Sequence, residues 1–502
     1  MIHVIFGPPG TGKTWTLLDE MEKHLQQGVS PEKIGFFTFS KNAAKEALDR
    51  AYEKFRIPAK ELRYFRTLHS LGFNQLEYDP NKVLKTKQYN EIGSKLGIEI
   101  RYATWDDDNG GILNSDSEYL SVIELARSKG ITPEQQYNKG EHRDPHMDLE
   151  TLKRFHRGIE GYKKDRPGWK DFTDMINEFV KSDRCPKLKV AFIDEAQDLS
   201  KKQWEVVAKI KNNCETLYVA GDDDQCIYRW RGADVHSFLN FKGTRRILNE
   251  SRRVPKRVFD VANKIINKIP ITNRVKKNWI PKKEEGFVDW HYDLSEIDFS
   301  TGNWLILGKD KWKLDEHESF FKENNIYYNR AKQKNNLADK FEAINLYENK
   351  LKKGVPLTFD ECEIIKKKMK TKEWTNKMFK AMVPNGFYDI STLREKYGLN
   401  TEAPWQEAFT KMGKTDTDKI TELMKKGEDL TSGARIKLAT IHGVKGNEKD
   451  NVVLPLDLTG AALESYEKNP DDEHRLMYVG ATRSKKTLHL IYPKSKVGGY
   501  DI

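Results

Sequence analysis

The octet Gly7-Pro8-Pro9-Gly10-Thr11-Gly12-Lys13-Thr14 constrains this chain more than any other segment. It follows a short apolar run, residues 1–6, which predicts a buried strand, and it precedes Leu17-Leu18, which predicts the start of a helix. Strand, glycine-rich loop and helix in this order are typical of a phosphate-binding P-loop. The glycines let backbone N–H groups surround phosphates, Lys13 can reach the outer phosphates, and the Thr14 hydroxyl can ligate Mg²⁺. The octet therefore predicts an α/β protein that binds ATP or GTP.

Length, charge and cysteine content narrow the class of protein further. A chain of 502 residues is too long for one ordinary core, so we expect two or more domains. The net charge of +11 points to a polyanionic partner, although solubility explains it nearly as well. The four cysteines form no C-x-x-C pair, which indicates neither a disulfide framework nor a zinc site. With no apolar run of about 18 residues and no signal peptide, we expect a cytoplasmic protein without a membrane partner.

Short apolar runs fall into two sets, and each run is bounded by a helical stretch or a polar turn, as parallel strands are in an α/β layer. The first set is residues 4–6, 34–37, 190–193 and 217–220, and the second is residues 304–307, 436–439, 452–454 and 488–491. A long, charged, helical stretch interrupts each set. The fold prediction is thus α/β, with two parallel-sheet domains that each carry a mainly helical insertion. The predicted boundaries are 1–70 and 186–247 for the first domain, 71–185 for its insertion, 248–345 and 434–502 for the second domain, and 346–433 for its insertion.

Two adjacent carboxylates, Asp194 and Glu195, follow the predicted strand 190–193. The carboxyl end of a strand is where an open α/β sheet presents its ligand-binding edge. Asp194 can hold the Mg²⁺ of a nucleotide, and Glu195 can orient or deprotonate the attacking water. With a P-loop upstream, the pair is a Walker B candidate.

Residues 221–233 join a polar head to an aromatic and basic tail. Gln225 in the head can touch the terminal phosphate of a nucleotide. Tyr228 and Trp230 in the tail offer flat faces on which bases stack, for about 1–3 kcal/mol each. Because they alternate with arginines and a glycine follows, both aromatic residues fit a protein core poorly. The segment predicts one element that senses both nucleotide and strand.

These segments stand in order with five others: residues 38–44, 66–69, 248–253, 440–448 and 478–483. Together they resemble the motif series of UvrD/Rep/PcrA-type superfamily 1A helicases, over almost the whole chain. The resemblance implies two RecA-like domains with ATP in the cleft between them and single-stranded DNA crossing above both. It also implies 3′→5′ movement along the strand, which spacing and charge do not demonstrate.

The resemblance assigns roles residue by residue. The first RecA-like domain would supply Lys13, Thr14, Asp194, Glu195 and Gln225 to catalysis, with Mg²⁺ held by Thr14 and Asp194. Arg253 and Arg483, from the second domain, look like the arginines that neutralise charge on the transferring phosphoryl group, so hydrolysis would depend on cleft closure. The remaining ATP contacts would come from Gly7 to Gly12 of the P-loop and from Arg252, Gly446 and Glu448, of which Glu448 corresponds to the ribose contact.

On the DNA side, the matching positions are Phe39, His69, Tyr228, Trp230, Arg231, Thr440 and His442. Aromatic stacking tolerates every base, so these residues imply binding that does not depend on sequence. For His69 and His442, a structural hydrogen bond inside the sheet is an equal alternative.

Three departures from the family pattern limit the transfer of roles. The chain starts six residues before Gly7, whereas family members carry a glutamine-containing, adenine-reading segment there. The aromatic residue that normally stacks on the base is replaced by Arg252, whose guanidinium plane stacks without hydrogen-bond readout. We therefore expect weaker discrimination among nucleoside triphosphates. The second insertion is also short, so its regulatory and duplex-contacting roles should not be assumed.

The predicted function is an ATP- and Mg²⁺-dependent DNA helicase that translocates on single-stranded DNA and unwinds duplex DNA. Its expected partners are single-stranded and duplex-junction DNA, together with replication or repair proteins, in a nucleoid-associated or viral replication setting. One alternative is a single-strand translocase that displaces proteins without efficient unwinding. Others are an inactive helicase-like scaffold that binds nucleic acid, and an enzyme that moves on RNA.

Overall fold

The computed structural model describes residues 1–106, 112–142, 144–331, 337–383, 386–425, 434–445, 447–458, 460–494 and 498–502. They form two compact units. Unit 1 contains Met1–Phe287, Thr459–Lys486 and Ile502, and unit 2 contains Val288–Leu458 and Thr487–Asp501. Within the described ranges, no helix is both long and apolar enough to cross a bilayer.

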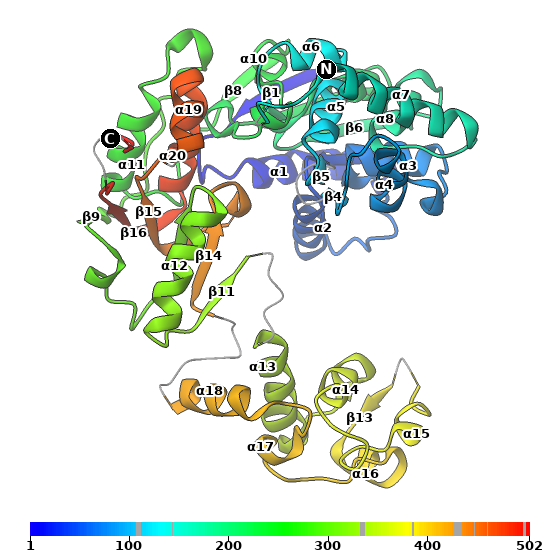
Figure 1. Ribbon diagram of the computed structural model, residues 1–502, viewed down its shortest axis with the longest axis vertical. Helices are drawn as coiled ribbons and strands as arrows, with labels where there is room; N and C mark the ends of the chain where they lie inside the picture. The colour runs from blue at the N-terminus through cyan, green and yellow to red at the C-terminus, as the bar shows by residue number, and fades with distance from the viewer. Residues whose placement is uncertain are drawn as a thin grey trace. The chain divides into compact units, whose positions relative to one another are not determined.

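A six-stranded sheet with the order β3-β2-β6-β7-β1-β8 forms the centre of unit 1, and all its neighbouring strands are parallel (Figure 1). The four strands predicted for this domain are confirmed as β1, β2, β6 and β7. The sequence did not reveal β3, which has three residues, or β8, whose side chains are all exposed. The strand bounds are β1 (Ile2–Phe6), β2 (Ile34–Thr38), β3 (Phe65–Thr67), β6 (Leu188–Ile193), β7 (Cys214–Gly221) and β8 (Thr244–Ile247).

Helices cover this sheet, and local sequence signals fix where they start. The Ser40 hydroxyl accepts a hydrogen bond from Ala43 N–H at the start of α2, and Ser200 with Gln203 forms a capping box at the start of α9. Leu17 and Leu18 of α1 are fully buried in the core beneath the sheet. The helices packed on this sheet are α1 (Lys13–Gln26), α2 (Lys41–Phe55), α9 (Lys201–Lys211) and α10 (Val235–Leu239). Unit 1 also contains α11 (Lys256–Ile266), α19 (Gly460–Lys468) and α20 (Pro470–Ala481), and α20 packs against both α11 and α19.

The first insertion is mainly helical, as predicted, and has a hydrophobic core of its own. Leu120, Leu152, Phe155 and Ile159 are fully buried in that core. A two-stranded antiparallel hairpin, β4 with β5, was not predicted. The elements of this region are α3 (Leu68–Gln75), α4 (Thr86–Ser94), β4 (Ala103–Asp106), β5 (Ile112–Ser115), α5 (Glu118–Lys129), α6 (Pro133–Tyr137), α7 (Leu149–Asp165) and α8 (Phe172–Lys181).

A second six-stranded sheet, with the order β11-β14-β10-β15-β16-β9, organises unit 2. The four strands predicted for the second domain are confirmed as β10, β14, β15 and β16, and β10 pairs in parallel with both β14 and β15. Helix α12 (Lys311–Glu323) packs on this sheet through Leu314 and Phe321. The strand bounds are β9 (Phe287–His291), β10 (Trp304–Gly308), β11 (Tyr328–Arg330), β14 (Ile436–Thr440), β15 (Lys449–Pro455) and β16 (Ser484–Ile491).

The second insertion is also mainly helical, with a core centred on the fully buried Tyr347 and Trp374. Its predicted end, residues 426–433, lies outside the described residues. The elements are α13 (Ala338–Ile344), β12 (Leu357–Thr358), α14 (Phe359–Lys366), α15 (Asn376–Phe379), β13 (Phe387–Tyr388), α16 (Ile390–Tyr397), α17 (Trp405–Ala408) and α18 (Lys414–Lys425). The predicted fold class is confirmed, whereas the exact domain boundaries stay a prediction.

Candidate nucleotide and nucleic-acid site

The P-loop joins β1 to α1 and is held by its own lysine. Gly7 N–H donates to Gly221 O at 3.0 Å, which places the loop beside the end of β7. Gly10 and Gly12 have φ values of 73° and 80°, a backbone region that favours glycine. Lys13 folds across the loop, and its Nζ donates to Gly7 O at 3.0 Å. A Cβ at Gly7 would lie 2.2 Å from Lys13 Cγ, so the lysine can cross the loop only because residue 7 is glycine.

Thr14 and Asp194 meet at the position predicted for Mg²⁺. The Thr14 hydroxyl donates to Asp194 Oδ2 at 2.7 Å. Burial, and next the neighbouring Glu195, raise the pKa of Asp194 to about 6. A divalent cation would offset this buried negative charge, and hydroxyl and carboxylate oxygens are ligands that Mg²⁺ takes. The two residues therefore fit the predicted ion.

Glu195 adopts an unusual backbone conformation for a residue with a side chain. Its φ of 54° and ψ of 40° lie in the left-handed region, which costs free energy outside glycine. Its N–H donates to Asp194 Oδ1 at 2.9 Å, and its Oε2 accepts from Gln197 Nε2 at 2.6 Å. The backbone and Gln197 together fix the direction of the Glu195 carboxylate.

Gln197 extends this contact into a buried chain of hydrogen bonds. Its Oε1 accepts from Asp222 N–H at 2.9 Å, and Asp222 Oδ2 in turn accepts from Gln225 Nε2 at 2.7 Å. Gln225 Oε1 then accepts from Arg483 Nη2 at 2.8 Å. Three residues, Gln197, Asp222 and Gln225, thus connect the predicted catalytic carboxylate to the predicted arginine that follows α20. The sequence assigned no role to Gln197 or Asp222; the one signal available was that each stands just after a predicted strand.

The segment before α11 packs directly against the P-loop. Ser251 Oγ donates to Pro9 O at 2.7 Å, and Arg252 N–H donates to Gly10 O at 2.9 Å. A Cβ at Gly10 would lie 2.4 Å from Arg253 Cβ. Arg253 is half-buried there and Arg252 is exposed. Arg253 and Arg483 both lie in unit 1 with the P-loop, and their delivery by closure between domains stays a prediction.

A fully buried lysine holds three consecutive aspartates next to Gln225. Lys277 Nζ lies 3.0 Å from Asp222 Oδ1 and 2.9 Å from Asp224 Oδ2, and it also donates to Asp223. Burial by itself would lower the pKa of Lys277, but the three carboxylates raise it well above its usual value. Arg274 binds Asp224 through two hydrogen bonds, of 2.8 and 2.7 Å. This cluster, which the sequence did not reveal, fixes the short helix that carries Gln225.

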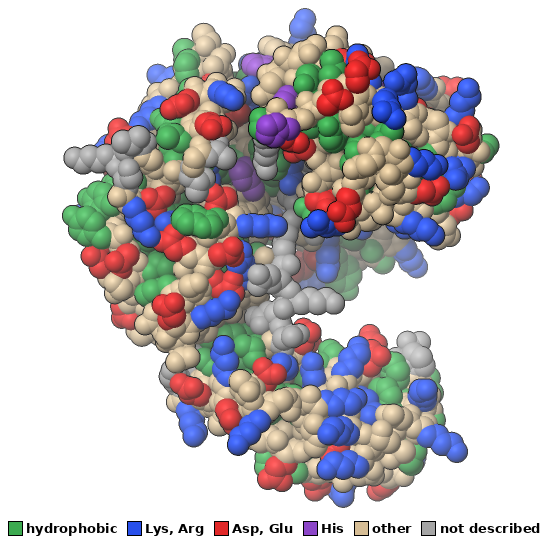
Figure 2. Space-filling view, in the orientation of Figure 1, with side chains coloured by type: hydrophobic (Ala, Val, Ile, Leu, Met, Phe, Trp, Pro, Cys, Tyr) green, Lys and Arg blue, Asp and Glu red, His purple; other side chains and the backbone are tan. Residues whose placement is uncertain are grey.

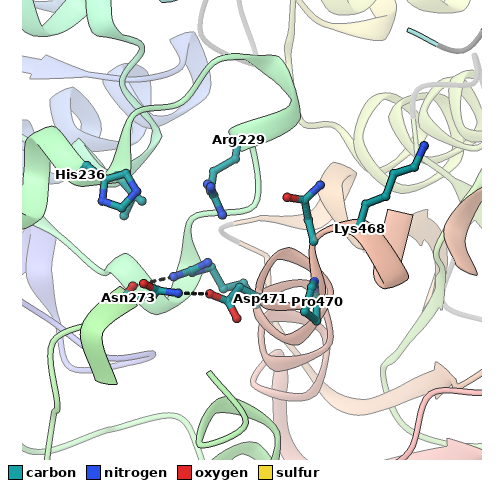
Figure 3. A pocket seen from close by; sticks show the side chains of 9 residues that line it. Arg229, His236, Asn273, Lys468, Pro470 and Asp471 are labelled. Carbon is teal, nitrogen blue, oxygen red and sulfur yellow. Dashed lines mark hydrogen bonds between the residues drawn. The ribbon is translucent and has the colours of Figure 1, made fainter. Parts of the chain in front are cut away.

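A cavity of about 310 Å³ lies at the start of α20 (Figure 3). Arg229 Nη1 lies 2.8 Å from Asp472 Oδ1. Asn273 Nδ2 donates to Asp471 Oδ2 at 2.7 Å, and Arg475 Nη2 donates to Asn273 O at 2.9 Å. P-loop residues are not among those that line the cavity. The Arg229–Asp472 pair fastens α20 to the segment that carries Trp230, and the other two bonds fasten α20 to Asn273.

The predicted DNA-contacting aromatics of unit 1 divide into buried and exposed residues. Phe39 and Tyr228 stack on each other, with ring centroids 5.4 Å apart. The expectation that Tyr228 fits a core poorly is wrong, because it packs on Phe39 and is only 4% exposed. Trp230 is 46% exposed, and the Arg231 guanidinium lies 4.3 Å from the centre of its ring. A base can therefore reach Trp230 far more easily than Tyr228.

The other predicted nucleic-acid contacts lie in both units. In unit 1, His69 is half-buried and its Nδ1 is 3.4 Å from Gln203 Nε2, a contact between α3 and α9 rather than inside the sheet, and its role stays a prediction. In unit 2, Thr440 ends β14 and its Oγ1 accepts from Gly443 N–H at 3.1 Å. His442 begins the short helix His442–Val444, and Glu448 directly precedes β15. Gly446 lies outside the described residues.

Positive charge is not concentrated on the face shown in Figure 2. Lysine and arginine side chains are spread there among acidic ones. The net charge of +11 is thus no guide to a nucleic-acid path on this face, and the exposed Trp230 is the more specific indication.

A P-loop, the Thr14–Asp194 contact and a glutamine–arginine contact, in a chain with two six-stranded α/β sheets, are typical of the P-loop class of α/β proteins. Comparison with known families is more specific. The UvrD/REP helicase N-terminal domain matches residues 2–245, and the UvrD-like helicase C-terminal domain matches residues 408–495. The chain belongs to the UvrD/Rep/PcrA-like superfamily 1 helicases.

Individual relatives are more distant. The chain is 26% identical over 326 residues to the ATP-dependent DNA helicase PcrA of Bacillus subtilis (strain 168), which covers 60% of this chain and 41% of the relative. It is 26% identical over 292 residues to PcrA of Staphylococcus epidermidis, which covers 52% of this chain and 37% of the relative. The chain thus spans about two fifths of the length of the curated relatives it matches.

Proposed function

We propose that this protein is an ATP-dependent DNA helicase that translocates on single-stranded DNA in the 3′→5′ direction and unwinds duplex DNA. The observation that carries this proposal is the buried hydrogen-bond chain from Glu195 to Gln225 and Arg483. Gln225 lies five positions before the exposed Trp230, so a change at the nucleotide is transmitted to the strand contact through one short segment.

Each residue of the site has a part in hydrolysis under this proposal. Lys13 and the P-loop N–H groups bind the β- and γ-phosphates, and Lys13 exchanges its bond to Gly7 O for a phosphate oxygen. Thr14 and Asp194 hold Mg²⁺, which neutralises phosphate charge when bound. Glu195 accepts a proton from the water that attacks the γ-phosphorus. Arg253 and Arg483 stabilise the negative charge that develops on the transferring group.

Coupling to movement follows from the partners of Gln225. The side-chain amide of Gln225 donates a hydrogen bond to Asp222 and accepts one from Arg483. A γ-phosphate would compete for the same groups. Binding and release of that phosphate therefore shift the segment that ends in Trp230 and Arg231. Because α20 is fastened to this segment through Arg229 and Asp472, the shift also reaches the helix that precedes Arg483.

Arg252 supports a further proposal, on the nucleotide base. Its backbone N–H bonds Gly10 O of the P-loop, and its side chain is exposed. A guanidinium can stack on a base, but it has hydrogen-bond donors alone. We therefore expect the affinities of the protein for GTP and CTP to lie within about tenfold of its affinity for ATP. Strict preference for ATP in a competition assay would contradict this part of the proposal.

Strand displacement from duplexes with a single tail tests the proposed activity. We expect unwinding of a duplex with a 3′ tail and none of a duplex with a 5′ tail. Exclusive use of the 5′ tail would overturn the direction. If the protein removes a bound protein block from single strands but unwinds no duplex, the proposal of a helicase is wrong and that of a single-strand translocase takes its place.

A further inference from the structure

Three side chains of metal-ligating type converge in unit 2, on neighbouring strands. They are Asp289 and His291 of β9 and His489 of β16. Each offers one ligand atom, and these atoms lie within 4.8 Å of one another. His291 Nε2 and His489 Nδ1 are 3.0 Å apart. The group does not overlap with the proposed nucleotide site, whose catalytic residues lie in unit 1.

The geometry of the sheet brings these residues together. Asp289 and His291 are two positions apart on one strand, so their side chains leave the same face. Strand β16 is the neighbour of β9, and Tyr492 N–H donates to His291 O at 2.9 Å (Figure 1). The two imidazole rings stack with centroids 5.2 Å apart. The register of the sheet therefore holds both rings in place before any ligand arrives.

The separation of the two histidine nitrogens suits a small tetrahedral metal ion. Zn²⁺ binds histidine nitrogen at about 2.0–2.1 Å, so two ligands in a tetrahedral site lie roughly 3.3 Å apart. The 3.0 Å between His291 Nε2 and His489 Nδ1 is close to this separation. Two imidazoles and one carboxylate favour Zn²⁺ and similar transition metals over Mg²⁺, which prefers oxygen ligands.

Two neighbouring side chains, Glu296 and Trp304, lie behind the histidines of the proposed metal site. The other ring nitrogen of His291, Nδ1, lies 3.9 Å from Glu296 Oε2, and this carboxylate oxygen also accepts from Tyr292 N–H at 2.8 Å. At 3.9 Å the carboxylate is too far to accept a hydrogen bond from the ring, but its negative charge would favour a cation bound at Nε2. His489 is buried against Trp304, with ring centroids 5.0 Å apart, which limits its motion.

We propose that Asp289, His291 and His489 bind one Zn²⁺ or a similar divalent transition-metal ion. The ion would join β9, the edge strand of the unit 2 sheet, to β16. An edge strand of five residues pairs on one side alone, so a cross-link of this kind stabilises it. Both strands also carry the chain across the boundary between the two units, at residues 287–288 and 486–487.

Titration calorimetry with Zn²⁺ tests the proposal. The untagged, chelator-treated chain of 502 residues is titrated in excess Mg²⁺, which keeps Zn²⁺ from the Thr14–Asp194 pair. We expect one Zn²⁺ per chain, and an affinity at least about tenfold weaker in Asp289→Asn and in His291→Gln. The controls His146→Gln and Asp298→Asn replace exposed residues of the same types and should bind Zn²⁺ as the parent does.

Co²⁺ gives a second readout, because its visible absorption reports the coordination geometry. An absorption band of tetrahedral Co²⁺ should appear at one equivalent, be displaced by Zn²⁺, and be absent in His291→Gln. Thermal midpoints of the metal-free variants show whether each is folded. If the parent binds no Zn²⁺ at micromolar concentration, or if both variants bind it unchanged, the histidines share a hydrogen bond alone and the proposal is wrong. Since these assays read metal binding, their outcome is independent of the helicase proposal.

Discussion

Replacing Lys277 by methionine tests whether the buried charge cluster fixes the segment that carries Gln225. The ammonium group is fully buried and contacts three carboxylates, at 3.0 Å for Asp222 and 2.9 Å for Asp224. Without it, Asp224 keeps Arg274, but Asp222 and Asp223 lose their buried cation. Loss of one partner from a buried ion pair costs about 3–5 kcal/mol, because an uncompensated charge is left behind. For a unit of this size we expect the melting temperature to fall on the order of 5–15 °C.

Scanning calorimetry measures this change, and two further variants make it specific. Lys276→Met removes an exposed neighbouring charge and should leave the melting temperature within about 2 °C of the parent. Adding Asp223→Asn to Lys277→Met removes one of the repelling carboxylates and should restore part of the loss. A shift below about 2 °C for Lys277→Met would refute the reasoning. It would mean that the aspartates do not need a cation to remain buried.

Two other predictions concern the proposed strand contact, Trp230, and the proposed Mg²⁺ ligand, Asp194. Trp230→Ala should weaken binding of single-stranded DNA roughly 5- to 150-fold by fluorescence anisotropy, the equivalent of about 1–3 kcal/mol of stacking, without lowering the melting temperature. Trp312→Ala, at another exposed tryptophan, is the matched control, and equal losses in both variants would rule out a specific contact. Asp194→Asn should melt above the parent at about pH 7.5 without nucleotide, because the folded state raises the pKa of Asp194 to about 6 and its charged form is destabilising there. This difference should shrink as the pH falls through about 6, and a constant difference would contradict the assignment.

The sequence was sufficient to predict those features of the fold and the site that depend on residues adjacent in the chain. Buried parallel strands are continuous apolar runs, so all eight predicted strands appear in the two sheets. Strand β8 was missed because its sequence, Thr-Arg-Arg-Ile, has the polarity of a loop, although it pairs in parallel with β1. The P-loop could be placed because its glycines, lysine and threonine are adjacent in the chain.

Features that depend on distant residues were not predictable from one sequence. Lys277 and Asp223 are 54 positions apart, and His291 and His489 are 198 positions apart. Only the fold brings these pairs together, and a single lysine or histidine carries no local signal of its partner. Tyr228 was misjudged for the same reason, because Phe39, which buries it, belongs to a segment far upstream.

The central claim is that hydrolysis in this P-loop site is coupled to a DNA strand. Steady-state ATPase rates, measured with single-stranded DNA, with RNA of the same sequence and with neither, test it most directly in the parent and in Lys13→Ala. We expect DNA to stimulate the parent more than RNA does, and Lys13→Ala to lose the stimulated rate by on the order of 10²–10³-fold or more. Stimulated hydrolysis that survives in Lys13→Ala, or a parent rate that single-stranded DNA leaves unchanged, would contradict the claim.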